Sequence, residues 1–240
     1  MDKYYRVGYN LDHHPMARAA LSGILPPASH PVMKIRKQNM PRFNDSLEMK
    51  IVIPNNVIHA YTDPSRYYHA LSHIQYMLEK LQALTGYNID PDMLNATMWA
   101  ILYHDIVYEI PDPHKLNEER SAEQFNLEHP HHPDKASILQ AILATKTHIL
   151  DDTASEIDKI VVDLDLWALA SRSMYRVNNI LIQKEVKASD DEWRVGRAAW
   201  IEGFLKRKQI YYTTHGKLRE TEARKILHAD LEDLRPPVEI

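Results

Sequence analysis

Apolar residues recur at helical spacing along most of the chain after about residue 60, whereas alternating runs typical of strands are scarce. The pattern predicts an all-α fold. Asp63-Pro64 and Asp90-Pro91 each place an N-cap acceptor before a proline suited to the first helical position, and Ser189 with Glu192 forms a capping box. We expect helices at about 64–85, 91–109, 117–128, 134–148, 154–171, 173–187, 190–208 and 219–234.

The first part of the chain has a different pattern, because prolines interrupt it repeatedly and its apolar patches are short. We expect an irregular N-terminal arm over 1–56 and one helical domain over 57–240, since no long Gly/Ser-rich or charged linker divides the helices. The arm is expected to pack on the surface of the domain. A contact between copies in a homo-oligomer and a cover over an active site are the alternatives.

Composition narrows the classes of function. The 240 residues contain no cysteine, which excludes disulfides, thiolate zinc sites and a cysteine nucleophile, and six glycines are too few for a Gly-loop nucleotide fold. A net charge of −4 argues against nucleic acid as the main partner. No apolar stretch is long enough for a membrane span and the start lacks a signal-peptide core, so we expect a cytoplasmic protein without a membrane partner.

His104 and Asp105 stand inside the otherwise apolar run Met98–Tyr108. Burial of a neutral polar group without a partner costs roughly 2–7 kcal/mol, and burial of a charge costs more. A divalent metal ion would satisfy an imidazole and a carboxylate together.

Two other apolar helices are interrupted in the same way. His69 and His73 are four residues apart and project from one helical face. Asp163 and Asp165 are two apart in the run 157–169, so at most one of them is expected to join a shared site. Each residue alone is more often structural than a ligand, but three such helices together favour a metal site.

The order His, His-Asp and a distant Asp on successive helices resembles the HD-domain metal-dependent phosphohydrolases. The residues that carry the resemblance are His73-Ile74-Gln75-Tyr76-Met77, His104-Asp105 and Asp163-Leu164-Asp165-Leu166. A subgroup of predicted bacterial HD phosphohydrolases is similar also at 66–74, 117–122 and 144–148, so the resemblance covers about residues 57 to 234. Gln183 and Val186 stand where that subgroup leads us to expect Arg and Tyr, which calls one substrate-side contact into question.

The resemblance implies a function and a ligand set. His73, His104, Asp105 and Asp165 would bind a divalent ion, and such mixed ligands suit Mn, Fe, Co, Ni, Zn or Mg. Open positions would accept water and a phosphate oxygen. The expected reaction is hydrolysis of a phosphate ester or anhydride in a small phosphorylated molecule, with a nucleotide as the expected substrate.

Further residues receive candidate roles, each with a plainer alternative. Glu118 or Glu119 could position water or act as a general base, although carboxylates are favoured at the start of any helix. Lys146 could hold phosphate and His148 could protonate a leaving group or bind a second metal, although cations are favoured at helix ends.

Arg66 could clamp a phosphate or form an ordinary surface ion pair. His69 could contact the ligands or the substrate, or make a structural hydrogen bond. Asp163 is expected to assist a ligand or to accept hydrogen bonds between helices. Aromatic side chains that could line a base-stacking pocket, or simply pack, are Tyr175, Trp193 and Trp200.

Three other readings stay open at this stage. The scaffold could bind a nucleotide or a partner without turnover. It could hold two irons as an oxygenase, which would require His69, His148 or a glutamate of the third helix as additional ligands. A purely structural helical protein would leave the four predicted ligands far apart.

Overall fold

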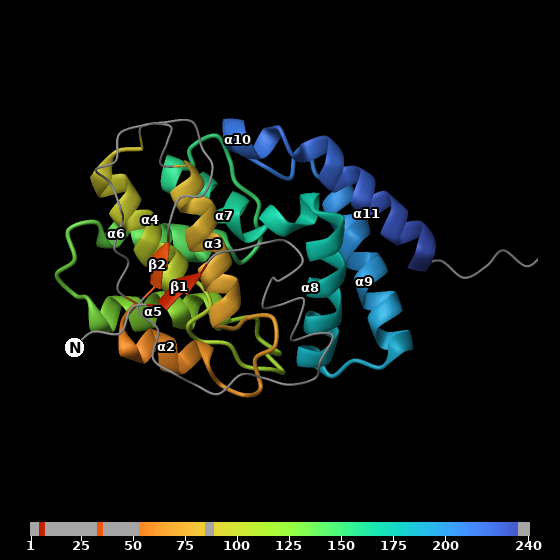
Figure 1. Ribbon diagram of the computed structural model, residues 1–240, viewed down its shortest axis with the longest axis horizontal. Helices are drawn as coiled ribbons and strands as arrows, with labels where there is room; N and C mark the ends of the chain where they lie inside the picture. Colours follow the sequence, from red (N-terminus) through yellow and green to blue (C-terminus); the bar gives the residue numbers. More distant parts are fainter. Residues whose placement is uncertain (1–4, 8–32, 36–52, 85–88, 235–240) are drawn as a thin grey trace, which may run out of the picture.

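The computed structural model describes residues 5–7, 33–35, 53–84 and 89–234, and the fold of the last two ranges is all-α, as predicted (Figure 1). A short parallel strand pair, β1 (Tyr5–Val7) with β2 (Met33–Ile35), accompanies the helices. The helices are α2 (Asn55–Tyr61), α3 (Leu71–Leu84), α4 (Pro91–Tyr103), α5 (Asn117–Glu128), α6 (Lys135–Ala144), α7 (Glu156–Asp165), the 3-10 helix η3 (Trp167–Ala170), α8 (Arg172–Val186), α9 (Asp190–Leu205), α10 (Thr214–Lys217) and α11 (Glu220–Leu234).

Local capping signals account for several of these bounds. Asp90 accepts hydrogen bonds from the backbone of residues 92 and 93 at the start of α4, and Ser189 with Glu192 forms the predicted capping box of α9. A further capping box, Ser155 with Asp158, starts α7. Most of the predicted arm, 1–56, lies outside the described residues, and α2 begins within its last positions.

The predicted helix 64–85 is wrong at its start, because α3 begins only at Leu71. The backbone N–H groups of Tyr67, Tyr68 and His69 donate to the carboxylate of Glu185 on α8 and not to helical carbonyls. Other expected helices are shorter than predicted: 91–109 ends at Tyr103, 134–148 ends at Ala144, and 154–171 divides into α7 and η3. The short helices α2 and α10 were not predicted.

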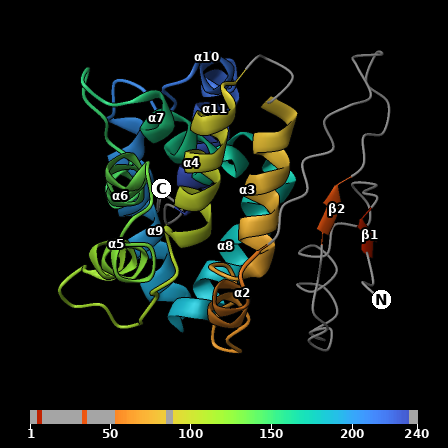
Figure 2. The same ribbon diagram turned by 90° about the vertical axis from the view of Figure 1, so that its left-hand side faces the viewer.

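Three groups of buried apolar side chains form the core; α7 contributes to the two larger ones, and the smallest joins α3, η3 and α8. On one side of α7 lie α2 to α6; on the other lie α8, α9 and α11 (Figure 1). Figure 2 shows the strand pair on the α3 side of the bundle, away from α5 and α6. No helix among the described residues is both long and apolar enough to cross a membrane.

Candidate metal centre

Three segments bring ligand-type side chains together. His73 lies on α3, His104 and Asp105 directly follow α4, and Asp165 ends α7; α3 packs against both α4 and α7. One ligand atom from each of His73, His104 and Asp165 lies within 4.8 Å of the others. This cluster, buried among helices, could hold a metal ion. Asp105 does not belong to that mutual set, but its Oδ2 lies 3.0 Å from Nε2 of His104.

The two ring nitrogens of His104 have different surroundings. Its Nδ1 lies 2.9 Å from the carbonyl oxygen of Ile101, and because a carbonyl only accepts, Nδ1 carries the proton. In the neutral ring the lone pair is then on Nε2. This buried atom makes no hydrogen bond of good geometry, and the Asp105 carboxylate lies 3.0 Å from it as a charged neighbour; the residue is 1% exposed. A histidine that donates one ring N–H to a carbonyl and turns the other nitrogen toward carboxylates is arranged as metal ligands usually are.

The cluster has a strong local field. Burial opposes the charge on His104, but the carboxylates of Asp105 and Asp165 and the carbonyl of Ile101 together outweigh burial and raise the pKa of His104 to about 9. Burial would raise the pKa of Asp105, whereas His104 and His69 lower it below its ordinary value. The Asp105 carboxylate is thus held in its charged form. Its negative charge would also stabilise a cation bound beside His104.

The turn that contains Asp105 is fixed by two side chains. The backbone N–H of Asp105 donates to the hydroxyl of Tyr61 at 3.1 Å. The guanidinium of Arg66 donates to the carbonyls of Asp105 and Ile106, each at 2.8 Å. Arg66, considered above as a phosphate clamp, is therefore engaged with the backbone beside the cluster and holds that backbone in place.

Asp165 divides its two oxygens between two histidines. Oδ1 accepts from His73 Nε2 at 3.0 Å, and Oδ2 lies 2.7 Å from His148 Nε2. Burial would raise the pKa of Asp165, but the hydrogen bonds of His148 and His73 hold it well below its ordinary value. His148 has a left-handed backbone (φ 52°), and its carbonyl accepts from Arg207 and from the hydroxyl of Tyr212.

His69 lies beside the cluster and not in it. Its Nε2 is 3.9 Å from Asp105 Oδ2, and its Nδ1 is 2.9 Å from Glu185 Oε2. Burial opposes protonation, but the carboxylates of Asp105 and Glu185 outweigh it and raise the pKa of His69. Glu185, which sequence reasoning did not single out, therefore orients this ring as well as the backbone before α3.

Asp163, considered above as an acceptor between helices, accepts hydrogen bonds from the two residues that precede α10. Its carboxylate accepts from the backbone N–H groups of Tyr212 and Thr213 and from the Thr213 hydroxyl, at 2.6–2.8 Å. Burial raises the pKa of Asp163 to about 6. Gly216 permits this close approach, since a Cβ there would lie 2.1 Å from Asp163 Oδ2.

The three remaining candidates lie on α5 and after α6. Lys146 forms an ion pair with Glu119, and this bond lowers the pKa of that glutamate. Glu118 is half-buried; burial raises its pKa, and the charge of Asp105 raises it further. Lys146 is thus committed to a carboxylate, while Glu118 is close enough to Asp105 to be affected by its charge.

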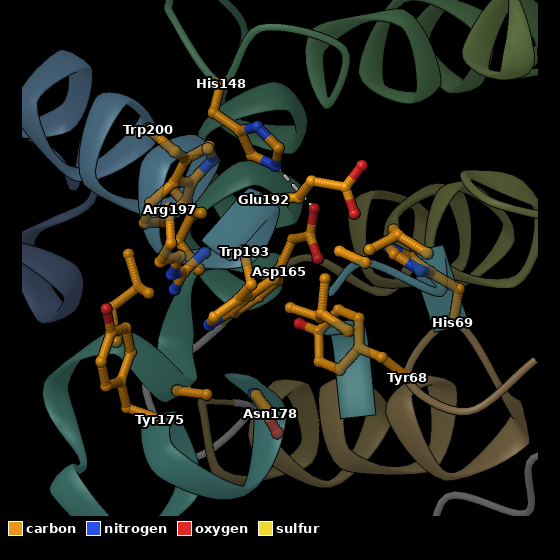
Figure 3. Close-up of a pocket in the computed structure, with 17 residues that line it drawn as sticks. Tyr68, His69, His148, Asp165, Tyr175, Asn178, Glu192, Trp193, Arg197 and Trp200 are labelled. Atoms are coloured by element: carbon orange, nitrogen blue, oxygen red, sulfur yellow. Dashed lines mark hydrogen bonds and ion pairs between the residues drawn. The ribbon is translucent and has the colours of Figure 1, made fainter. Parts of the chain in front are cut away.

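A cavity of about 410 Å³ opens beside the cluster (Figure 3). Asp165, His148 and His69 line one end of it. Tyr175, Trp193 and Trp200, considered above as a base-stacking pocket, also line it. Arg197 and Asn178 join them, and neither was singled out from the sequence. The volume falls within the range of roughly 300–1,000 Å³ typical of small-molecule sites.

Comparison of the chain with models of protein families, with curated proteins and with solved structures finds no match. The resemblance to HD-domain phosphohydrolases therefore stays a prediction from sequence motifs. The structure adds an independent observation, which is that ligand atoms of His73, His104 and Asp165 lie within 4.8 Å of one another in a buried cluster.

Proposed function

We propose that the protein is a metal-dependent phosphohydrolase that acts on a small phosphorylated molecule, for which a nucleotide is the expected substrate. The observation that supports this most directly is the buried Nε2 of His104, which makes no hydrogen bond of good geometry and lies among ligand atoms of His73, Asp105 and Asp165. A set of imidazoles and carboxylates suits Mn, Fe, Co, Ni, Zn or Mg.

His73, His104 and Asp165 would hold the ion, and Asp105 would complete the set from the side of His104. The chemistry that such an ion supplies when bound is Lewis-acid activation of water and neutralisation of charge on phosphoryl oxygens. The cavity beside Asp165 gives the substrate a place next to that chemistry.

Two histidines that line the cavity can move protons there. His148 lines the cavity and shares its Nε2 proton with Asp165, so this proton would leave the carboxylate to reach the oxygen of a leaving group. His69 is held at Nδ1 by Glu185, which leaves Nε2 to hold a proton or to orient water. Lys146 and Arg66 are engaged elsewhere, so the proposal assigns them no contact with phosphate.

The test combines metal content with turnover. The purified protein is loaded with Mn²⁺, Co²⁺ or Ni²⁺, the bound metal is measured by elemental analysis, and release of phosphate or pyrophosphate is measured over a nucleotide panel. We expect His104→Ala and Asp105→Ala to lose both metal and activity. His114→Ala and Asp152→Ala, which change exposed residues outside the cluster, are matched controls and should retain both.

Activity that survives His104→Ala and Asp105→Ala would overturn the proposal. Binding of nucleotides without any turnover across the panel would replace it with a binding module. Two ions per chain, together with consumption of O₂, would favour the oxygenase alternative described above.

A further inference from the structure

The part of the cavity away from the metal cluster contains a buried cation without a counter-ion among the described residues. Arg197 is only 7% exposed, and among the described residues no carboxylate forms an ion pair with it. Its guanidinium makes no hydrogen bond to the part of the chain that the structure describes, and its Nε is buried without a partner. A buried charge without a partner is costly, so the arrangement points to a ligand that supplies the missing acceptors.

Aromatic rings surround the guanidinium. Its central carbon lies 3.9 Å from the ring centre of Trp200 and 5.1 Å from that of Tyr175, and Figure 3 shows Arg197 between these two rings. Rings stabilise the charge through their faces but accept no hydrogen bond from the N–H groups in the guanidinium plane. Those N–H groups form a flat fork that matches two adjacent acceptors.

The rest of the cavity favours an uncharged occupant. Its walls are mainly aromatic and aliphatic, and Asn178, which is 8% exposed, adds an oxygen without a partner. A carboxylate apart from the metal cluster, that of Glu192, also lines the cavity, so an anionic group beside it would meet repulsion. A flat ring with hydrogen-bonding edges suits these walls better than a carboxylate or a second phosphate.

We infer, on the basis of the proposed function, that this cavity binds the base of a 6-oxopurine nucleotide, with O6 and N7 facing Arg197. Arginine donates readily to this pair of acceptors, whereas a 6-aminopurine presents an amino donor in the place of O6. The phosphoryl end of the same molecule would then lie toward Asp165 and His148, which line the same cavity.

The binding test uses nucleosides, which lack phosphate, so that recognition of the base is measured apart from hydrolysis. Calorimetric titration of the full chain should show inosine binding about tenfold or more tightly than adenosine. Arg197→Met, which removes the guanidinium but keeps an apolar stem, should reduce this preference to about threefold or less.

A second pair of variants leaves Arg197 unchanged. A Cβ added at Gly196 or at Gly203, both on α9, has no atom within 4 Å, but only Gly196 lines the cavity. Gly196→Leu should therefore abolish inosine binding, whereas Gly203→Leu should retain it. Far-UV circular dichroism confirms that each variant is folded.

Equal affinities for inosine and adenosine would overturn the inference, and so would an inosine preference that persists in Arg197→Met. Tighter binding of benzoate than of inosine would overturn it too, because Arg197 would then serve an anion. These outcomes are distinct from failure of the proposed function: nucleotide hydrolysis with no preference for a base refutes the inference alone, and inosine binding without hydrolysis refutes the function alone.

Discussion

Glu185 is the buried residue whose removal gives the sharpest test of how the site is supported. It is 4% exposed and lies on α8, where its carboxylate accepts from the backbone N–H groups of residues 67–69 at 3.2–3.4 Å. It also contacts His69 Nδ1 at 2.9 Å. Glu185→Ala leaves these donors without an acceptor in a buried place, whereas Glu185→Gln keeps the shape and one acceptor oxygen.

The magnitude follows from these contacts. Removal of one partner from a buried charged arrangement costs about 3–5 kcal/mol. For a chain of this size each kcal/mol lowers Tm by about 2–4 °C, so Glu185→Ala should lower Tm by about 6–20 °C. Glu185→Gln should still cost about 1–3 kcal/mol because its amide group turns a donor toward other donors, but it should cost less than Glu185→Ala because one oxygen still accepts.

Thermal unfolding followed by circular dichroism measures the effect, and urea unfolding gives the free energy independently. Glu202→Ala, at an exposed position of α9, is the control and should change Tm by about 2 °C at most. A Tm for Glu185→Ala within that same margin would refute the reasoning, because the carboxylate would then contribute no net stability to the segment before α3.

Three further predictions concern separate parts of the fold. Gly216→Ala should destabilise the protein by about 2–4 kcal/mol in urea unfolding because its Cβ would collide with Asp163, whereas Gly203→Ala should be neutral or stabilising by up to about 1 kcal/mol. In Arg66→Lys the single ammonium group cannot span two carbonyls, so we expect the free energy of unfolding to fall by about 1–3 kcal/mol and the metal occupancy to fall as well. An unchanged free energy and occupancy would contradict this. Burial lowers the pKa of His129, so the stability contributed by its neutral ring is present above pH 6.5 and is lost as the pH falls through the lowered pKa. A pKa of 6.5 or higher for His129, measured by NMR titration, would disprove this.

The sequence predicted helices best where the signals are local. The bounds of α5, 117–128, agree with the structure, and the caps at Asp90 and Ser189 lie where they were expected. The error at 64–70 has a distant cause, since Tyr67 and Glu185 are 118 residues apart. Local propensity cannot reveal that a carboxylate so far along the chain replaces the helical acceptors.

At the candidate site, too, local signals were predictable from the sequence and long-range contacts were not. Ligand-type residues that interrupt apolar helices indicated the three segments, and the resemblance to a known family singled out His73 and Asp165 within them. The partners of Arg66 and Lys146 could not be predicted from the sequence, because a basic side chain binds whichever acceptor the tertiary fold brings near.

Signals for the missed residues did exist in the helical spacing. Glu185 shares a buried helical face with Asn178 and Leu181, which marks it as an acid at a core position. Arg197 lies four residues after Trp193 and three before Trp200, so the three side chains share one face of α9.

The positions of the ligands along the chain have a consequence for folding kinetics. His73 and Asp165 are 92 residues apart, so an ion held by both would join segments that meet only after much of the chain is ordered. Interactions absent from the folding transition state slow unfolding and leave the folding rate nearly unchanged. Added metal should therefore prolong the lifetime of the folded chain without shortening the time that it needs to fold.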